Sequence, residues 1–86
     1  MKIKLKFFGF NEVEKVIGGK EIDLDLNGTT YGDLLEYLHK AYGESIKKAL
    51  GQQILRNGKE WIRMDDLGYS LQDGDQLTFL RMVSGG

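Results

Sequence analysis

Residues 71–86 read LQDGDQLTFLRMVSGG, a stretch in which a turn and a strand lead into a tail that ends on two glycines. Asp73, Gly74 and Asp75 are typical of a tight turn, with the glycine at positive φ and the aspartates accepting hydrogen bonds from local backbone N–H groups. The aspartates could instead be metal ligands, but a turn is the far commoner use of this tripeptide. Residues 76–82 predict the last strand, which fixes where the tail leaves the body.

The tail carries little side-chain bulk. Gly85 and Gly86 have no Cβ, so their backbone can pass through a channel too narrow for side chains. The group we expect to react is a free α-carboxylate on Gly86, which is a poor electrophile until it is activated, for instance by adenylation. A frayed terminus would look similar. At average glycine usage, however, a Gly-Gly end arises by chance in only roughly 0.5% of chains.

Composition excludes several classes of function. The 86 residues predict one domain, and an apolar fraction of 41% with 29% charged residues is typical of a globular protein. The absence of cysteine excludes thiolate metal sites and a cysteine nucleophile, and a single histidine excludes a histidine-rich metal cage. A net charge of −1 argues against nucleic-acid binding. No apolar run suits a membrane span or a signal peptide, so we expect a cytoplasmic protein.

Two strands are predicted in the first third of the chain. Residues 2–7 alternate lysines with apolar residues, and residues 20–26 alternate acidic with apolar residues. Residues 11–20 are predicted to be a polar connection closed by two glycines, so the strands should form an antiparallel hairpin. The lysine row would then lie across from the acidic row. The expected inward-facing residues are Ile3, Leu5, Phe7, Ile22, Leu24 and Leu26.

The hydrophobic period then changes from two to about 3.6, which indicates a helix. Thr30 followed by Asp33 resembles a capping box, with aspartate in place of the usual glutamate or glutamine. An apolar stripe runs from there to Gly43, which is suited to a C-cap. A shorter helix is expected over residues 44–50. The stripe consists of Tyr31, Leu34, Leu35, Leu38, Ala41 and Tyr42.

The remaining segments predict the rest of a mixed sheet. Residues 54–56 and 60–62 flank Asn57-Gly58, a strong signal for a two-residue hairpin turn. This order of elements predicts an α+β domain over residues 1–86, with one main helix packed on one face of the sheet. If the first and last strands are parallel neighbours at its centre, the topology is the ubiquitin-like β-grasp.

An exposed apolar patch is expected on the sheet face that the helix leaves open, because such patches usually mark partner surfaces. Its predicted members are Phe8, Phe10, Leu80 and Met82. Arg81 could reach acidic groups on the same partner, and Trp61 fits either the core or a partner surface. Two alternatives stay open: a loop covers these residues, or the alternation slips at Gly9.

These features resemble the ubiquitin-like sulfur carriers of the MoaD/ThiS family, typified by the small subunit of molybdopterin synthase. The resemblance covers the whole chain in order and is carried by four segments. They are KFFG at 6–9, T-x-x-D-L-L at 30–35, L-x-D-G-D-x-L-x-F at 71–79 and VSGG at 83–86. One departure is that MoaD-type tails often carry prolines where this chain has Arg81-Met82.

The resemblance implies a non-catalytic carrier with no permanently bound cofactor and no metal. An adenylating enzyme, similar to ubiquitin-activating enzymes, would bind the patch, thread Val83, Ser84 and Gly85 into its active site and use ATP to adenylate Gly86. A sulfur donor such as a cysteine desulfurase or rhodanese would then convert Gly86 into a thiocarboxylate. A large synthase subunit would receive this sulfur for molybdopterin, and neither nucleic acid nor a membrane would take part.

The same features are compatible with other functions. Gly86 could form isopeptides with target lysines, as in a ubiquitin-like modifier. The carried sulfur could instead serve thiamine synthesis or tRNA thiolation. A binding module with this fold and an inert tail is a further alternative.

Overall fold

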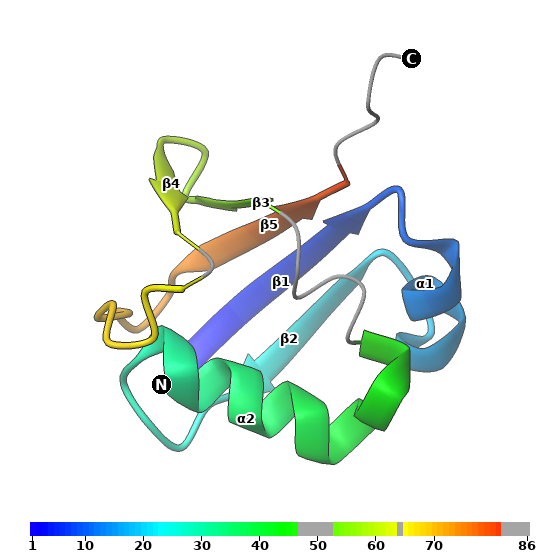
Figure 1. The fold of residues 1–86 in the computed structure, drawn as a ribbon, viewed down its shortest axis with the longest axis horizontal. Coiled ribbons are helices and arrows are strands. Elements are labelled where there is room, and N and C mark those ends of the chain that lie inside the picture. The colour runs from blue at the N-terminus through cyan, green and yellow to red at the C-terminus, as the bar shows by residue number, and fades with distance from the viewer. Residues whose placement is uncertain (47–52, 64, 82–86) are drawn as a thin grey trace.

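The computed structural model describes residues 1–46, 53–63 and 65–81. Strands and helices alternate from β1 to η1, and the three strands β3, β4 and β5 follow (Figure 1). The elements are β1 (Lys2–Phe8), α1 (Asn11–Ile17), β2 (Glu21–Asp25), α2 (Tyr31–Tyr42), the 3-10 turn η1 (Gly43–Ile46), β3 (Gln53–Arg56), β4 (Glu60–Ile62) and β5 (Gln76–Leu80). None of these helices is long and apolar enough to cross a bilayer.

The strands form one mixed sheet in the order β2-β1-β5-β3-β4. The first and last strands, β1 and β5, are parallel neighbours at its centre, with Phe7 in register with Phe79. Strand β2 pairs antiparallel with β1, and β3 pairs antiparallel with β5. This arrangement is the ubiquitin-like β-grasp, so the predicted fold class is confirmed.

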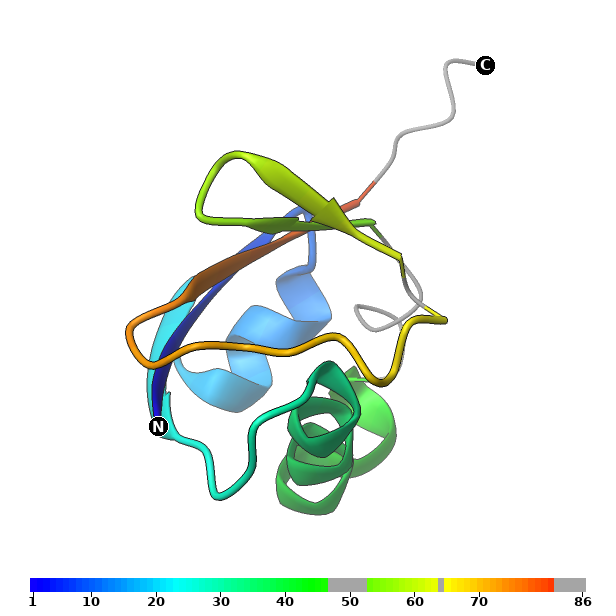
Figure 2. The ribbon, with the colours of Figure 1, turned by 90° about the vertical axis from the view of Figure 1, so that its left-hand side faces the viewer.

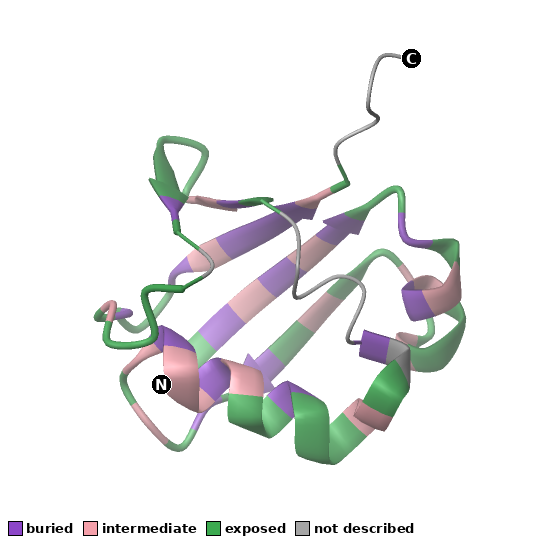
Figure 3. Ribbon diagram, viewed as in Figure 1, coloured by how far each residue is buried: buried purple, intermediate pink, exposed green. Residues whose placement is uncertain are grey.

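The core lies between one face of the sheet and the two helices, which both pack on that face (Figure 2). Burial alternates along β1 and β2, as a half-covered sheet requires (Figure 3). Phe7 stacks on Phe79 across the central strands with ring centroids 4.9 Å apart. Of the residues predicted to face inward, Ile22 is only partly buried and the others are buried.

Helix α2 begins as its sequence predicts. The Thr30 side chain accepts a hydrogen bond from the Asp33 backbone N–H, and the Asp33 carboxylate accepts one from the Thr30 backbone N–H, which completes the capping box. Gly43 ends the helix at φ 62°. Most of the predicted stripe faces the core, but Ala41 is exposed. Of the predicted second helix, η1 covers its beginning and residues 47–50 lie outside the described residues.

The predicted polar loop over residues 11–20 is wrong, because most of it is the helix α1. Val13 is fully buried, and Gly18 ends the helix in the left-handed conformation with its N–H bonded to the Glu14 carbonyl oxygen at 2.9 Å. The helix is only seven residues long and its N-cap, Phe10, makes no side-chain capping bond. It therefore lacks the start signal that marks α2.

Candidate functional site

The face of the sheet opposite the helices carries side chains in rows that cross the strands, because in-register residues of neighbouring strands point to the same side. One row crosses all five strands and changes from charged to apolar along its length. It consists of Glu21, Lys6, Thr78, Leu55 and Trp61. The next row places Phe8 beside Leu80. The open face therefore has a charged half over β2 and β1 and an apolar half over the ends of β1, β5, β3 and β4.

We call the apolar half the open-face patch; its members are Phe8, Leu55, Trp61 and Leu80. Phe8 is 49% exposed and Trp61 57% exposed, while Leu55 and Leu80 are partly buried. The predicted placement of Phe8 and Leu80 on the open face is confirmed by their register. The sequence left Trp61 open between the core and a partner surface, and it did not point to Leu55 as a member of the patch. The Asn57-Gly58 turn was the available signal, since a two-residue hairpin turn fixes their register.

The predicted exposure of Phe10 is wrong. This residue is fully buried and packs edge-on against Phe7, with ring centroids 6.4 Å apart. The cause lies at Gly9, whose φ of 86° turns the chain back toward the core before α1 begins. The strand alternation therefore slips at Gly9, which was one of the two alternatives left open.

Arg81 is the last described residue before the tail, and it is held against the Gly9 turn. Its backbone N–H donates to the Phe8 carbonyl oxygen at 3.2 Å, and its guanidinium donates to the Gly9 carbonyl oxygen at 3.1 Å. The guanidinium also lies 3.8 Å from Glu12 Oε1 and 5.5 Å from the centroid of the Phe10 ring. The point from which the tail leaves is thus tied to the end of β1.

The opposite end of the β1–β5 pair is closed by the predicted turn at residues 73–75. Gly74 has φ 88°, and its N–H donates to the Lys2 carbonyl oxygen at 2.7 Å. Asp73 accepts a hydrogen bond from the Lys2 backbone N–H at 2.6 Å, so it holds the start of β1. Asp75 accepts one from the Gln72 backbone N–H at 2.8 Å. Both aspartates therefore have the structural role that the sequence predicted.

Asp75 is also the centre of a buried ion pair that the sequence did not predict. It is 4% exposed and takes two hydrogen bonds from Arg56, from Nε at 2.8 Å and from a terminal nitrogen at 3.2 Å. Burial by itself would raise the pKa of the Asp75 carboxyl. The hydrogen bonds from Arg56, Gln72 and Asn57 outweigh that effect and hold this pKa below its ordinary value.

Two further groups extend the network around Arg56. The Tyr69 hydroxyl donates to Glu60 Oε2 at 2.6 Å and accepts from Arg56 at 3.1 Å. The bond between Tyr69 and Glu60 raises the pKa of Tyr69 and, together with Arg56, lowers the pKa of Glu60. These groups bond to one another between β3, β4 and the turn, so they stabilise the fold and are not arranged around a substrate site.

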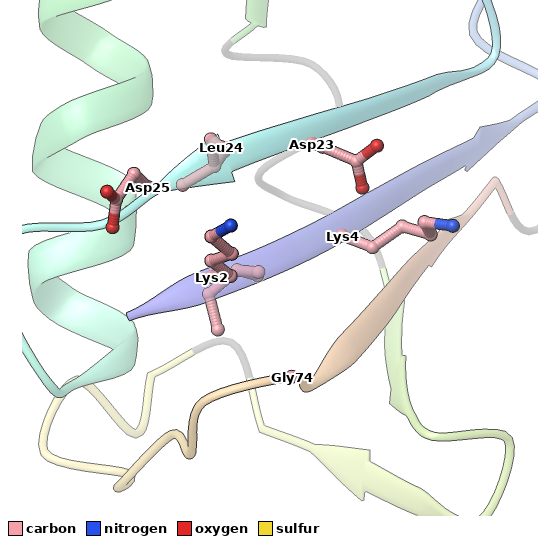
Figure 4. Close-up of a pocket in the computed structure, with 7 residues that line it drawn as sticks. Lys2, Lys4, Asp23, Leu24, Asp25 and Gly74 are labelled. Carbon is pink, nitrogen blue, oxygen red and sulfur yellow. The ribbon is translucent and has the colours of Figure 1, made fainter.

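The charged half of the open face contains a shallow hollow of about 560 Å³ between β1 and β2 (Figure 4). Lys2 faces Asp25 and Lys4 faces Asp23 in register, so each cation lies across from an anion. This balance gives the hollow little preference for an anion or a cation. Within the described residues no group of three or more histidine, cysteine, aspartate or glutamate side chains could hold a metal ion.

The predicted reactive residue and the predicted tail residues lie outside the described residues. These are Met82, Val83, Ser84, Gly85 and Gly86, and their roles stay predictions. The structure brings together the features that precede them, namely the open-face patch and the Arg81 anchor at the ends of β1 and β5.

Three comparisons with known proteins agree with this architecture. The sequence profile of the ThiS family matches residues 7–86. Small archaeal modifier protein 3 of Haloferax volcanii is 28% identical over an alignment of 94 residues that covers both chains completely. The crystal structure of small archaeal modifier protein 1 from the same organism has a TM-score of 0.71 at 27% identity, with both chains fully covered. A chain in the complex of subunits 1 and 2 of the molybdopterin-converting factor from Helicobacter pylori has a TM-score of 0.66 at 28% identity, also over both full chains.

Proposed function

The chain belongs to the ThiS family, and on that premise we propose that it is a sulfur carrier for molybdopterin biosynthesis. Its relatives are ubiquitin-like carrier and modifier proteins, and the chain is likewise a non-catalytic member of that group. In this proposal the working group is the α-carboxylate of Gly86. No cofactor is bound permanently, and ATP is consumed by a separate activating enzyme in the cytoplasm.

The observation that supports the proposal most strongly is that the apolar residues of the open face lie at the end of the sheet that precedes the tail. Phe8 and Leu80 are in register at the end of the sheet where the chain continues toward the tail. An enzyme that covers the open-face patch therefore also lies beside Leu80 and Arg81, after which the sequence continues to Gly86. Apolar contact supplies affinity, and the tail supplies the reacting group. A carrier needs both features and no catalytic side chain.

The proposed reaction at Gly86 has three steps. A carboxylate oxygen of Gly86 attacks the α-phosphorus of ATP, and pyrophosphate leaves, which gives an acyl-adenylate. A persulfide sulfur of the donor enzyme attacks the carbonyl carbon, and AMP leaves, which gives an acyl disulfide. A thiol then cleaves the S–S bond, so that Gly86 keeps the terminal sulfur as a thiocarboxylate and the two enzyme thiols become a disulfide.

The proposed partners are three. The adenylating enzyme binds first, and a cysteine desulfurase or a rhodanese supplies the persulfide. A large synthase subunit then receives the carrier, by analogy with the Helicobacter pylori factor, whose two subunits form a complex. Because one tail serves each partner in turn, we propose that all three use the open-face patch in succession.

The decisive experiment is intact-mass analysis of the protein purified from its native host. We expect a species that ends at Gly86 and has one oxygen replaced by sulfur. Reaction with a thiocarboxylate-specific alkylating or sulfonyl azide reagent should shift only that species. Deletion of Gly86 is the matched control, because it leaves residues 1–85 unchanged and should abolish the sulfur-containing species. Absence of that species while the host makes molybdopterin would contradict the proposal.

A second candidate is supported by the small archaeal modifier proteins among the relatives. In that function the activated Gly86 carbonyl is attacked by a lysine amine of a target protein, and an isopeptide forms. Host lysates would then contain a ladder of conjugates that depends on Gly86. Peptide mapping of the ladder should identify a branched lysine that carries the tail sequence. Both products can arise from the same acyl-adenylate.

A further inference from the structure

We propose that the Arg81 guanidinium, held by the Gly9 carbonyl and the Glu12 carboxylate, is a positioning residue that fixes the root of the tail for adenylation. The inference rests on the proposed function, since it concerns how the Gly86 carboxylate reaches the activating enzyme. It assigns to Arg81 a role within the chain, in place of the contact with partner acids that its sequence position indicates.

The contacts of the Arg81 side chain all point back to one segment. The guanidinium donates to the Gly9 carbonyl oxygen at 3.1 Å, lies 3.8 Å from Glu12 Oε1 and covers the Phe10 ring at 5.5 Å. Three different kinds of interaction therefore hold one side chain: a hydrogen bond, an ion pair and a cation–π contact. The side chain is nevertheless 43% exposed, so it contributes little to the core.

Glu12 supplies the negative charge that faces the Arg81 guanidinium. Its Oε1 atom is buried and accepts no hydrogen bond from the described residues. The Arg81 guanidinium is its ion-pair partner, at a distance that allows attraction without a hydrogen bond. A buried carboxylate oxygen is unfavourable unless a positive charge lies close by. Glu12 and Arg81 are therefore expected to depend on each other.

Gly9 leaves the space that the Arg81 side chain occupies. A Cβ at this position would lie 3.1 Å from the Arg81 Cβ, closer than ordinary van der Waals contact. Gly9 also needs its positive φ of 86° to turn the chain into α1. Gly9 therefore has two roles at the end of β1: it leaves room for the Arg81 side chain, and it allows the chain to turn.

The consequence for the reaction follows from chain length. Gly86 lies five positions after Arg81. A chain of that length spans at most about 17 Å when fully extended, so the place of Arg81 limits where the carboxylate can be. If Arg81 is fixed relative to the open-face patch, the effective concentration of the Gly86 carboxylate near the enzyme's ATP is higher once the folded domain has docked. A free root would spread the same tail over a larger volume.

The test is ATP–pyrophosphate exchange catalysed by the adenylating enzyme purified from the native host, with the carrier as the varied substrate. Arg81→Gln should lower kcat by about two- to tenfold, because the loosened root must be ordered in each encounter. Its KM should stay within about twofold, since the patch that governs docking is intact. Arg81→Lys should recover part of kcat, because an ammonium keeps the charge beside Glu12 but loses the planar contact with Phe10.

A double-mutant cycle with Glu12→Gln separates an internal role from a contact with the enzyme. If Arg81 acts through Glu12, the double variant should have nearly the kcat of Arg81→Gln alone. Lys40→Gln is the matched control: it removes a cation from an exposed ion pair with Glu36 on α2, which packs on the other face of the sheet, and should leave kcat and KM unchanged. Nitrogen relaxation of the Arg81 Nε–H group in the free protein should show order that Glu12→Gln abolishes.

Several outcomes would overturn the inference. One is an Arg81→Gln variant with normal kcat. Another is that Arg81→Gln raises KM and that this effect and the effect of Glu12→Gln on KM simply add in the double variant. If Arg81→Gln does not fold, Glu12→Gln and Arg81→Lys decide the matter by the same kcat criterion. Failure of the proposed function is distinct, because then deletion of Gly86 would leave exchange unchanged.

Discussion

The two ends of the central β1–β5 pair are built in opposite ways. At the turn end, Asp75 is 4% exposed and the Arg56 side chain 15% exposed, and their charges are paired inside the protein. At the tail end, Phe8 is 49% exposed and lies beside Leu80 on the open face. Burying charge and exposing apolar surface are both unfavourable for an isolated domain. The buried ion pair stabilises the folded domain, and the exposed apolar surface is expected where a partner protein will cover it.

The largest predicted effect is at the turn end. Arg56→Met should lower the free energy of unfolding by about 3 kcal/mol, because it leaves the Asp75 carboxylate buried without its positive partner. Urea denaturation followed by circular dichroism measures this change. At a temperature where the variant is folded, adenylation of Gly86 should be unaffected, since the tail end is untouched.

The control is Arg63→Met, which makes the same substitution at an exposed arginine. Arg63 pairs with Asp65 at 3.0 Å, but its side chain is 81% exposed. Exposed ion pairs contribute little, so the urea midpoint should not move. Equal losses in the two variants would mean that the Arg56–Asp75 pair is no more important to stability than a surface pair.

The next effect is at the tail end and concerns binding instead of folding. Trp61→Ala should weaken binding of the activating enzyme by about 2 kcal/mol, as expected for an exposed aromatic anchor at an interface. Phe8→Asp should prevent binding, because it places a charge in the open-face patch. Both variants should keep the urea midpoint of the parent. Isothermal titration with the enzyme and urea denaturation measure the two properties separately.

A matched control for the patch is Leu67→Ala. Leu67 is 53% exposed, and its carbonyl oxygen accepts from the Gly32 N–H at the start of α2, away from the open face. Its truncation should leave enzyme binding unchanged. Equal weakening by Leu67→Ala and Trp61→Ala would show that general surface hydrophobicity drives binding, and the open-face patch would lose its special role.

Sequence alone was sufficient where local chemistry decides the structure. The capping box at Thr30 and Asp33, the Asn57-Gly58 turn and the Asp73–Asp75 turn depend on residues within a few positions of each other. The parallel pairing of β1 with β5, which was the condition for the predicted β-grasp topology, is present in the structure. The placement of Phe8 and Leu80 followed from that pairing and from the period of two.

Sequence failed where a contact depends on distant segments. Helix α1 has few turns and no capping side chain, and it is held by packing of Val13 and Phe10 into the core. The Arg56–Asp75 pair joins residues 19 positions apart, and Arg81 meets Gly9 across 72 positions. Neither pair leaves a periodic signal. The predicted exposure of Phe10 failed for a local reason: the positive φ at Gly9 ends the alternation of β1 and turns Phe10 into the core.

A smaller stability effect is predicted at Tyr31, the first residue of α2. Its hydroxyl is buried without a hydrogen-bond partner in the described residues, and burial raises its pKa to about 12. Tyr31→Phe removes an unsatisfied polar atom and keeps the ring, so the free energy of unfolding at neutral pH should rise by about 1 kcal/mol. A loss of stability in urea denaturation would mean that the hydroxyl is satisfied, for example by an ordered water.

The smallest predicted effect is the acid response of the turn end, because burial offsets part of the lowering of the Asp75 pKa. Its pKa in the folded protein lies below the ordinary value of 3.8, so the unfolded chain binds more protons in that window. The stabilisation is complete above pH 3.8 and is lost as pH falls through the folded pKa. Arg56→Met should raise the pKa of the folded Asp75 relative to the parent, since burial is then opposed only by the hydrogen bonds from Gln72 and Asn57. The urea midpoint of the variant should therefore approach that of the parent as pH falls from 6 to 3. A constant gap between the two curves would show that Arg56 does not control the ionisation of Asp75.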